Sequence, residues 1–109
     1  MNPRLYLWQR STAALMAPLV IVHLAVIFYA TRQGLSAQDI LGRTRGSIAW
    51  GLFYSLFVCA ATIHAAIGLR TVLVEWGSMR SRSAGMLALV ISVLLVALGL
   101  RAVYAMVAA

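Results

Sequence analysis

The feature that most limits the fold is a run of 22 residues without an Asp, Glu, Lys or Arg, from Ile48 to Leu69. A helix rises about 1.5 Å per residue, so this run is long enough to cross the roughly 30 Å hydrocarbon core of a bilayer. Two similar runs lie at residues 11–30 and 86–107, and only the second of these contains a charge, Arg101. The sequence therefore predicts an all-α protein with three transmembrane helices, in a single domain over residues 1–109.

The composition favours a membrane protein over a soluble one. Hydrophobic residues make up 63% and charged residues 10% of the chain, against about 45–50% and about 25% in soluble domains. The net charge of +7 comes from arginines that flank the apolar runs, which indicates interfacial anchors and topology signals rather than nucleic-acid binding. The single cysteine, Cys59, excludes an internal disulfide and is expected to be a small buried side chain.

Three spans place the two termini on opposite sides of the membrane. The first run is longer than the core of a typical signal peptide, so it is interpreted as a retained span. Five arginines lie on the side that holds the N-terminus and the second connection: Arg4, Arg10, Arg70, Arg80 and Arg82. Three arginines lie in the first connection: Arg32, Arg43 and Arg45. The positive-inside rule then predicts a cytoplasmic N-terminus.

The two connections differ in character. Residues 31–46 are expected to carry a short interfacial helix, because Ser36 followed by Asp39 resembles a capping box and Gly42 resembles a helix stop. Residues 77–85 are small, polar and basic, which predicts a loop.

Two histidines are the polar side chains that are most costly to place inside these runs. His64 lies in the second run, with Gly68 one helical turn further along the same face. A glycine there leaves room beside the imidazole for a flat ligand such as haem, and Arg70 falls where the run ends, within reach of an anionic group. Neutral imidazole is a common axial ligand of haem iron, so haem binding is one interpretation of His64. An interhelical hydrogen bond is the other.

His23 is the only candidate for a second axial ligand within the chain, and it follows Pro18, which is expected to kink the first helix. Thirteen residues separate Arg10 from His23, or about 20 Å of helix, and six separate His64 from Arg70, or about 9 Å. Both arginines belong to the same membrane side, so the two imidazoles are expected to differ in depth by about 10 Å. The second ligand of a haem on His64 is therefore expected from another chain.

The chain lacks the groups of a stand-alone enzyme. Its two acids, Asp39 and Glu75, lie near water, and no P-loop, GxGxxG or HExxH motif occurs. No catalytic residue is expected, and a subunit that holds a cofactor or a partner is favoured. A small transporter subunit is a weaker interpretation, because no acid is buried in a span to couple ions.

The second run also resembles a known family. The stretch His64-Ala-Ala-Ile-Gly68-Leu-Arg70-Thr71-Val-Leu-Val-Glu75 resembles the second-helix motif of the cytochrome b membrane anchor of succinate dehydrogenase and fumarate reductase, His-x-x-x-Gly-x-Arg-His-x-x-x-Asp. The stretch Gln9-Arg10-Ser11-Thr12-Ala13 resembles the His-Arg-x-Ser-Gly sequence that opens the family's first helix. Thr71, Gln9 and Ala13 depart from the histidines and glycine of these motifs.

The resemblance implies a haem b-binding subunit of a succinate:quinone oxidoreductase, as in respiratory complex II, in the bacterial inner membrane. His64 would bind the haem iron, a second small anchor subunit would supply the other ligand, and Arg70 would lie near a haem propionate. Arg10, with Ser11 or Thr12 beside it, would line a ubiquinone or menaquinone pocket next to the iron–sulfur subunit. A flavoprotein subunit would oxidise succinate and pass electrons through iron–sulfur clusters to the quinone.

A second haem follows from the same resemblance. Val22-His23-Leu24, followed by Arg32 and Gly34, resembles the first-helix histidine of two-haem members. His23 would then bind a distal haem iron, and Arg101 would contact its propionate. The alternatives are an interhelical hydrogen bond for His23 and a snorkelling anchor for Arg101. If both histidines only make hydrogen bonds, the chain is a non-haem structural anchor or assembly subunit.

Overall fold

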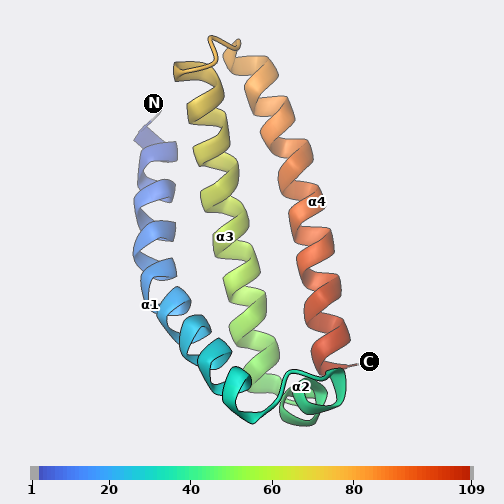
Figure 1. Ribbon diagram of the computed structural model, residues 1–109. Coiled ribbons are helices and arrows are strands. Elements are labelled where there is room, and N and C mark those ends of the chain that lie inside the picture. Colours follow the sequence, from blue (N-terminus) through green and yellow to red (C-terminus); the bar gives the residue numbers. More distant parts are fainter. Residues whose placement is uncertain (1–2, 109) are drawn as a thin grey trace.

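The computed structural model describes residues 3–108, which form three long helices and a short one. The long helices are α1 (Pro3–Gln33), α3 (Ile48–Glu75) and α4 (Ser81–Val107), and the short one is α2 (Ala37–Thr44). Figure 1 shows α3 between α1 and α4, with α2 at the end of the bundle where the C-terminus lies. Each long helix is apolar enough to cross a membrane and contains one predicted span. The prediction of an all-α fold with three transmembrane helices is confirmed.

The dimensions of the bundle suit a bilayer. Its longest extent is 47 Å, which exceeds the roughly 30 Å hydrocarbon core and reaches into both headgroup regions. The N-terminus and the connection between α3 and α4 lie at one end, and α2 and the C-terminus lie at the other (Figure 1). Helix α1 changes direction part-way along in the same view, and it contains Pro18, whose missing N–H accounts for such a bend.

Large apolar side chains cover the outside of the helices instead of filling a core. Ile21, Leu52 and Leu98 are each more than 60% exposed. In water such a surface would drive association, but in a bilayer it faces lipid tails. Cys59 belongs to this surface: it is exposed, and the expectation that it is buried is wrong for the chain taken alone.

Helices α3 and α4 approach each other closely through small residues. Ala84 and Ala88 of α4 are buried, with 0% and 6% of their surface exposed. A Cβ built at Gly99 would lie 2.5 Å from Cγ1 of Val58 on α3, so only glycine fits that position without a shift. Small residues at helix contacts are typical of membrane bundles, because lipid supplies no hydrophobic drive between helices and packing must do so.

The connection before α4 is shorter than the loop predicted over residues 77–85. Helix α4 already begins at Ser81, and the N–H of Ala84 donates to the Arg80 carbonyl oxygen at 2.9 Å in its first turn. The prediction was wrong here because small polar residues resemble a loop by composition. In the bundle their small size lets the first turn of α4 pack on α3.

The helix start predicted at Ser36 is confirmed, but among residues 3–108 the capping box is only half formed, because the Ser36 backbone N–H makes no bond to Asp39. The Ser36 hydroxyl accepts a hydrogen bond from the Asp39 backbone N–H at 3.1 Å and donates to the Asp39 carboxylate at 2.7 Å. Gly42, however, does not end the helix, which continues to Thr44. The backbone turns instead at Gly46, whose φ of 75° is in the left-handed region that glycine adopts most readily.

Helix α2 is tied to the C-terminal end of α4. The Thr44 hydroxyl donates to the Met106 carbonyl oxygen at 2.8 Å, and the Gly46 N–H donates to the Val107 carbonyl oxygen at 2.7 Å. These carbonyls have no partner within α4, because the last turn of a helix leaves its acceptors unpaired. The contact fixes α2 against the bundle end.

Candidate functional site

His64 lies on the side of α3 that faces α1. Its Nδ1 atom is 3.4 Å from Oγ1 of Thr12, a buried residue of α1. The Thr12 oxygen also lies 2.8 Å from the Trp8 carbonyl oxygen and 3.1 Å from that of Gln9, one turn earlier in α1. Within residues 3–108, Nε2 of His64 forms no hydrogen bond. The imidazole is thus joined to α1 through one ring nitrogen, and the other ring nitrogen has no hydrogen-bond partner among these residues.

Gly68 lies on the α1 side together with His64. A Cβ built at Gly68 would lie 3.4 Å from Nε2 of Gln9, so the space expected for a flat ligand is filled at this point by the Gln9 amide. The Oε1 atom of Gln9 is buried and has no hydrogen-bond partner in the described part of the chain. A buried amide oxygen without a donor is costly.

Arg70 points to a different neighbour. A Cβ built at Gly85 of α4 would lie 3.6 Å from Nε of Arg70, so the guanidinium stem runs along the first turns of α4. Six residues of helix turn the side chain by about 240° from His64. The structure therefore places His64 and Arg70 on different sides of α3, and does not bring them together on one face.

His23 packs between aromatic rings of α3. Its ring makes edge contacts with Phe57 at 5.1 Å and with Tyr54 at 5.9 Å between centroids. Its Nδ1 atom is buried and has no hydrogen-bond partner among residues 3–108. The interhelical hydrogen bond considered for His23 is therefore not formed with any described side chain.

The two histidines occupy different depths in the bundle. His23 contacts Phe57, which precedes His64 by seven residues, or about 10 Å of helix. The proximity of Gln9 to Gly68 also places the Arg10 and Arg70 ends of α1 and α3 at the same end of the bundle. The structure thus agrees with the predicted difference in depth between His23 and His64, and with the placement of Arg10 and Arg70 on the same side.

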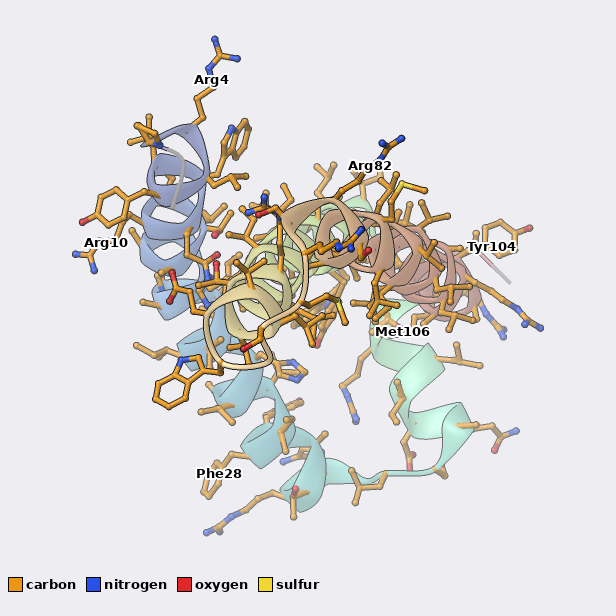
Figure 2. The ribbon with its side chains drawn as sticks, turned by 90° about the horizontal axis from the view of Figure 1, so that it is seen from above. Arg4, Arg10, Phe28, Arg82, Tyr104 and Met106 are labelled. Carbon is orange, nitrogen blue, oxygen red and sulfur yellow. The ribbon has the colours of Figure 1, made fainter. Side chains whose placement is uncertain are left out.

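Arg10 and Ser11 lie apart from His64. Both are exposed, and Figure 2 shows the Arg10 side chain directed away from α3 and α4. Thr12, the third polar residue of this stretch, faces inward instead. A pocket that uses Arg10 and Ser11 would need a wall from another molecule, because the other helices of this chain do not cover these two side chains.

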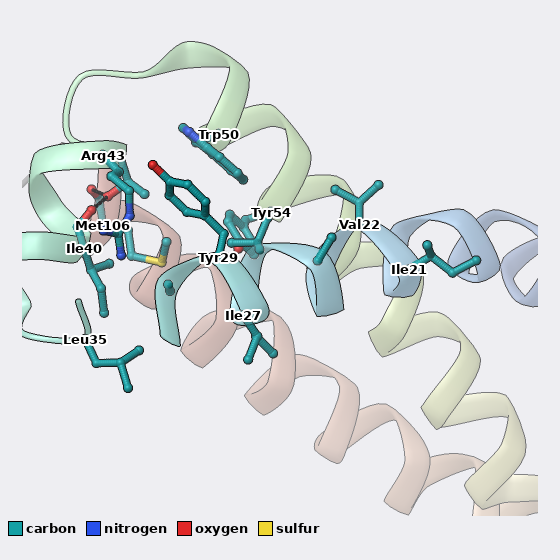
Figure 3. A pocket seen from close by; sticks show the side chains of 14 residues that line it. Ile21, Val22, Ile27, Tyr29, Leu35, Ile40, Arg43, Trp50, Tyr54 and Met106 are labelled. Atoms are coloured by element: carbon teal, nitrogen blue, oxygen red, sulfur yellow. Dashed lines mark hydrogen bonds between the residues drawn. The ribbon is translucent and has the colours of Figure 1, made fainter. Parts of the chain in front are cut away.

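A cavity of about 590 Å³ lies at the opposite end of the bundle, where α1, α2, α3 and α4 converge (Figure 3). Its walls are mostly apolar, with Arg43 as the single charged residue. The Arg43 guanidinium is fixed there because it donates to the Gly34 carbonyl oxygen at 2.9 Å and lies 5.6 Å from the Tyr29 ring centroid. Tyr54 lines the cavity and also contacts His23.

The sequence motifs predict neither the contact between Thr12 and His64 nor the cavity at the end of the bundle. The pairing of Thr12 with His64 follows from depth, because Gln9 lies opposite Gly68 and the two helices run in opposite directions. Thr12 lies three residues after Gln9 in α1, and His64 lies four residues before Gly68 in α3. Thr12 and His64 therefore lie at the same depth. The cavity depends on how α2 folds against α4, which no periodicity indicates.

A comparison with family models decides the identity of the chain. A model described as the succinate dehydrogenase/fumarate reductase transmembrane subunit matches residues 4–100. The chain belongs to this family. Neither the comparison with curated proteins nor that with solved structures gave a match. As a succinate dehydrogenase/fumarate reductase transmembrane subunit, the chain is an integral membrane protein with an anchor role in a complex that contains catalytic subunits.

Proposed function

We propose that this transmembrane subunit binds haem b and anchors a succinate:quinone oxidoreductase of the succinate dehydrogenase or fumarate reductase type. The observation that carries the proposal is the state of His64. Its Nδ1 atom is paired with Thr12, while Nε2 has no hydrogen bond with residues 3–108. This arrangement suits a histidine ligand of iron, whose second ring nitrogen is usually hydrogen-bonded to a neighbouring group.

In this proposal His64 supplies one axial ligand, and a second small anchor subunit supplies the other. The depth difference between His64 and His23 supports a ligand from outside the chain. A bound haem b would carry one electron at a time between the iron–sulfur clusters and a quinone. The exposed outer surface of the helices offers the area on which the second anchor subunit would pack.

Arg70, Arg10 and Ser11 have supporting roles. Arg70 has no hydrogen bond or ion pair with residues 3–108, so its guanidinium can neutralise an anionic group at the end of the span, a haem propionate among them. Arg10 and Ser11 would bind the ubiquinone or menaquinone headgroup, with the iron–sulfur subunit closing the pocket over the exposed face of α1. The flavoprotein subunit would bind to the iron–sulfur subunit.

His23 is the candidate ligand of a second haem. Its buried and unpaired Nδ1 supports this role, as does the neighbouring cavity at the end of the bundle. Arg101, which is exposed near that end of α4, would meet a propionate of this haem. Haem content per complex should fall from two to one in His23→Ala if both haems are present, and stay unchanged if His64 alone binds haem.

The orientation proposed for the chain puts the N-terminus in the cytoplasm of a bacterium. Five arginines lie at the end with the N-terminus and the α3–α4 connection, and at the other end Arg32, Arg43 and Arg45 lie between the last turn of α1 and the start of α3, with Arg101 near the end of α4. A reporter enzyme that is active only outside the inner membrane should work when fused to the C-terminus and fail when fused to the α3–α4 connection. The reverse pattern would overturn the orientation.

A non-haem structural anchor is the second candidate function. It is favoured by the same Thr12–His64 hydrogen bond, since an interhelical bond of this kind can stabilise a bundle without a cofactor. A visible spectrum of the purified complex separates the two candidates. Haem b binding predicts an α band of reduced b-type haem that is lost in His64→Ala while the subunits still copurify. An intact complex without haem absorbance would establish the structural anchor instead.

A further inference from the structure

The hydrogen-bond geometry at Thr12 favours one tautomer of His64. The Thr12 hydroxyl has one hydrogen, and two backbone carbonyl oxygens of α1 lie 2.8 Å and 3.1 Å from its oxygen. Carbonyl oxygens only accept, so the hydroxyl hydrogen is directed to them. This back-bonding to the preceding turn is the usual arrangement of a threonine inside a helix.

The Thr12 oxygen therefore presents lone pairs to His64. A contact between this oxygen and Nδ1 is favourable only when Nδ1 carries the hydrogen and donates. In neutral imidazole the other nitrogen, Nε2, then has the lone pair. The Trp8 carbonyl, the Thr12 hydroxyl and the His64 imidazole form a chain of hydrogen bonds that ends in a nitrogen able to bind a metal.

We propose that Thr12 is the positioning residue for His64: its hydroxyl fixes the Nδ1–H tautomer and the ring orientation, so that Nε2 is presented to the haem iron. This inference rests on the proposed haem-binding role. Thr12 is 5% exposed, and a hydrogen bond in such a buried position is electrostatically stronger than one in water. Acceptors for the second nitrogen of a ligating histidine also raise its basicity. Thr12 thus tunes the iron as well as placing the ring.

Thr12→Val is the informative substitution, because valine has nearly the same shape but neither donates nor accepts. In the complete complex, purified with its partner subunits, haem affinity should fall about tenfold or more, the range seen when such outer partners of metal ligands are removed. The remaining haem should have a higher midpoint potential, since a less basic imidazole stabilises ferric iron less. The low-spin electron paramagnetic resonance signal should shift as the ring loses its fixed orientation.

Thr12→Ser keeps the hydroxyl and should restore the potential and the resonance signal. Thr31→Val is the matched control: the Thr31 hydroxyl donates to the Ile27 carbonyl oxygen at 2.8 Å in the same helix, but has no imidazole beside it. It should leave haem content and potential as in the unmodified complex. If Thr12→Val does not assemble, Thr12→Ala provides the same comparison with Thr12→Ser, because alanine also lacks the hydroxyl and is smaller.

The outcomes separate this inference from the haem-binding proposal. An unmodified complex without a haem that depends on His64 overturns the proposed function. A complex whose haem depends on His64, but whose content, potential and resonance signal are the same in Thr12→Val or Thr12→Ala as in Thr12→Ser, overturns the positioning role alone. A shift in the variants without the hydroxyl, with recovery in Thr12→Ser, supports it.

Discussion

A methyl group added at Gly99 tests the contact that holds α3 and α4 together. A Cβ at this position would lie 2.5 Å from Cγ1 and 3.0 Å from Cγ2 of Val58. Carbon atoms attract each other best at about 3.5–4.0 Å, so both distances are repulsive. Valine is stiff about its first side-chain bond, and a helix strongly prefers one of its rotamers. Gly99→Ala therefore forces either a strained Val58 or a wider separation of the helices.

The change in the free energy of unfolding caused by Gly99→Ala follows from two opposing effects. Overpacking a well-packed contact costs about 1–3 kcal/mol, whereas replacing a glycine inside a helix by alanine gains up to about 1 kcal/mol. The separation of 2.5 Å lies far inside the contact distance, so the cost belongs to the upper half of its range. We expect Gly99→Ala to lower the free energy of unfolding by about 1–2 kcal/mol.

The assay is a titration with sodium dodecyl sulfate in mixed micelles, with helix content followed by circular dichroism. Val58→Ala removes both methyl groups that the new Cβ meets, so the double variant should be more stable than the sum of the single effects by at least about 0.5 kcal/mol. Gly42→Ala is the control, because a Cβ at Gly42 meets nothing within 4 Å, and it should not destabilise the chain. A Gly99→Ala variant as stable as the unmodified protein, or strict additivity with Val58→Ala, would refute the reasoning.

Three further substitutions test other contacts. Gly68→Ala should change stability by less than about 1 kcal/mol, because its Cβ meets only the flexible end of Gln9 at 3.4 Å; a larger loss in the same titration would mean that a rigid group lies there. Ser36→Ala removes the N-cap of α2 and should cost that helix about 1 kcal/mol, seen as faster amide hydrogen exchange in α2 but not in α4. Thr44→Val removes the bond to the Met106 carbonyl and should cost about 1 kcal/mol, with most of it recovered in Thr44→Ser; equal stability of the two variants would contradict the assignment.

The long helices could be predicted from the sequence because one physical requirement decides them. A segment in hydrocarbon must satisfy all its backbone hydrogen bonds internally, so an apolar run of sufficient length has to be a helix. The cap at Ser36 was predictable for a similar reason, since its hydroxyl meets a backbone N–H only three residues away. Both signals are local, and neither depends on how the helices pack.

The errors lie where packing decides the outcome. The composition of the first turn of α4 predicts a loop, yet this turn is helical and Ala84 is fully buried. Gly42 resembles a helix stop, but α2 continues to Thr44, whose hydroxyl reaches the end of α4. In each case a contact with a distant helix extends the element beyond its local signal.

The site was predictable in part, and the missing part was geometric. The sequence identified His64 as a costly polar group and correctly placed it at a different depth from His23. It could not show that Gln9 fills the space over Gly68, or that Arg70 turns toward α4, because both depend on side-chain contacts between helices. The motif places Thr12 only beside Arg10, as part of a quinone pocket, and so does not predict it as the partner of His64.

The two faces of α3 make different kinds of contact. Toward α4 the contacts are made by small residues such as Gly99, Gly85 and Ala84, which allow close packing. Toward α1 the contacts are polar or aromatic: His64 meets Thr12 there, and His23 meets the rings of α3. Both buried polar atoms that lack a partner among residues 3–108, on Gln9 and His23, also belong to α1. Since buried polar groups in native proteins are almost always hydrogen-bonded, these two atoms are candidates for a bond to a ligand or partner subunit on the α1 side.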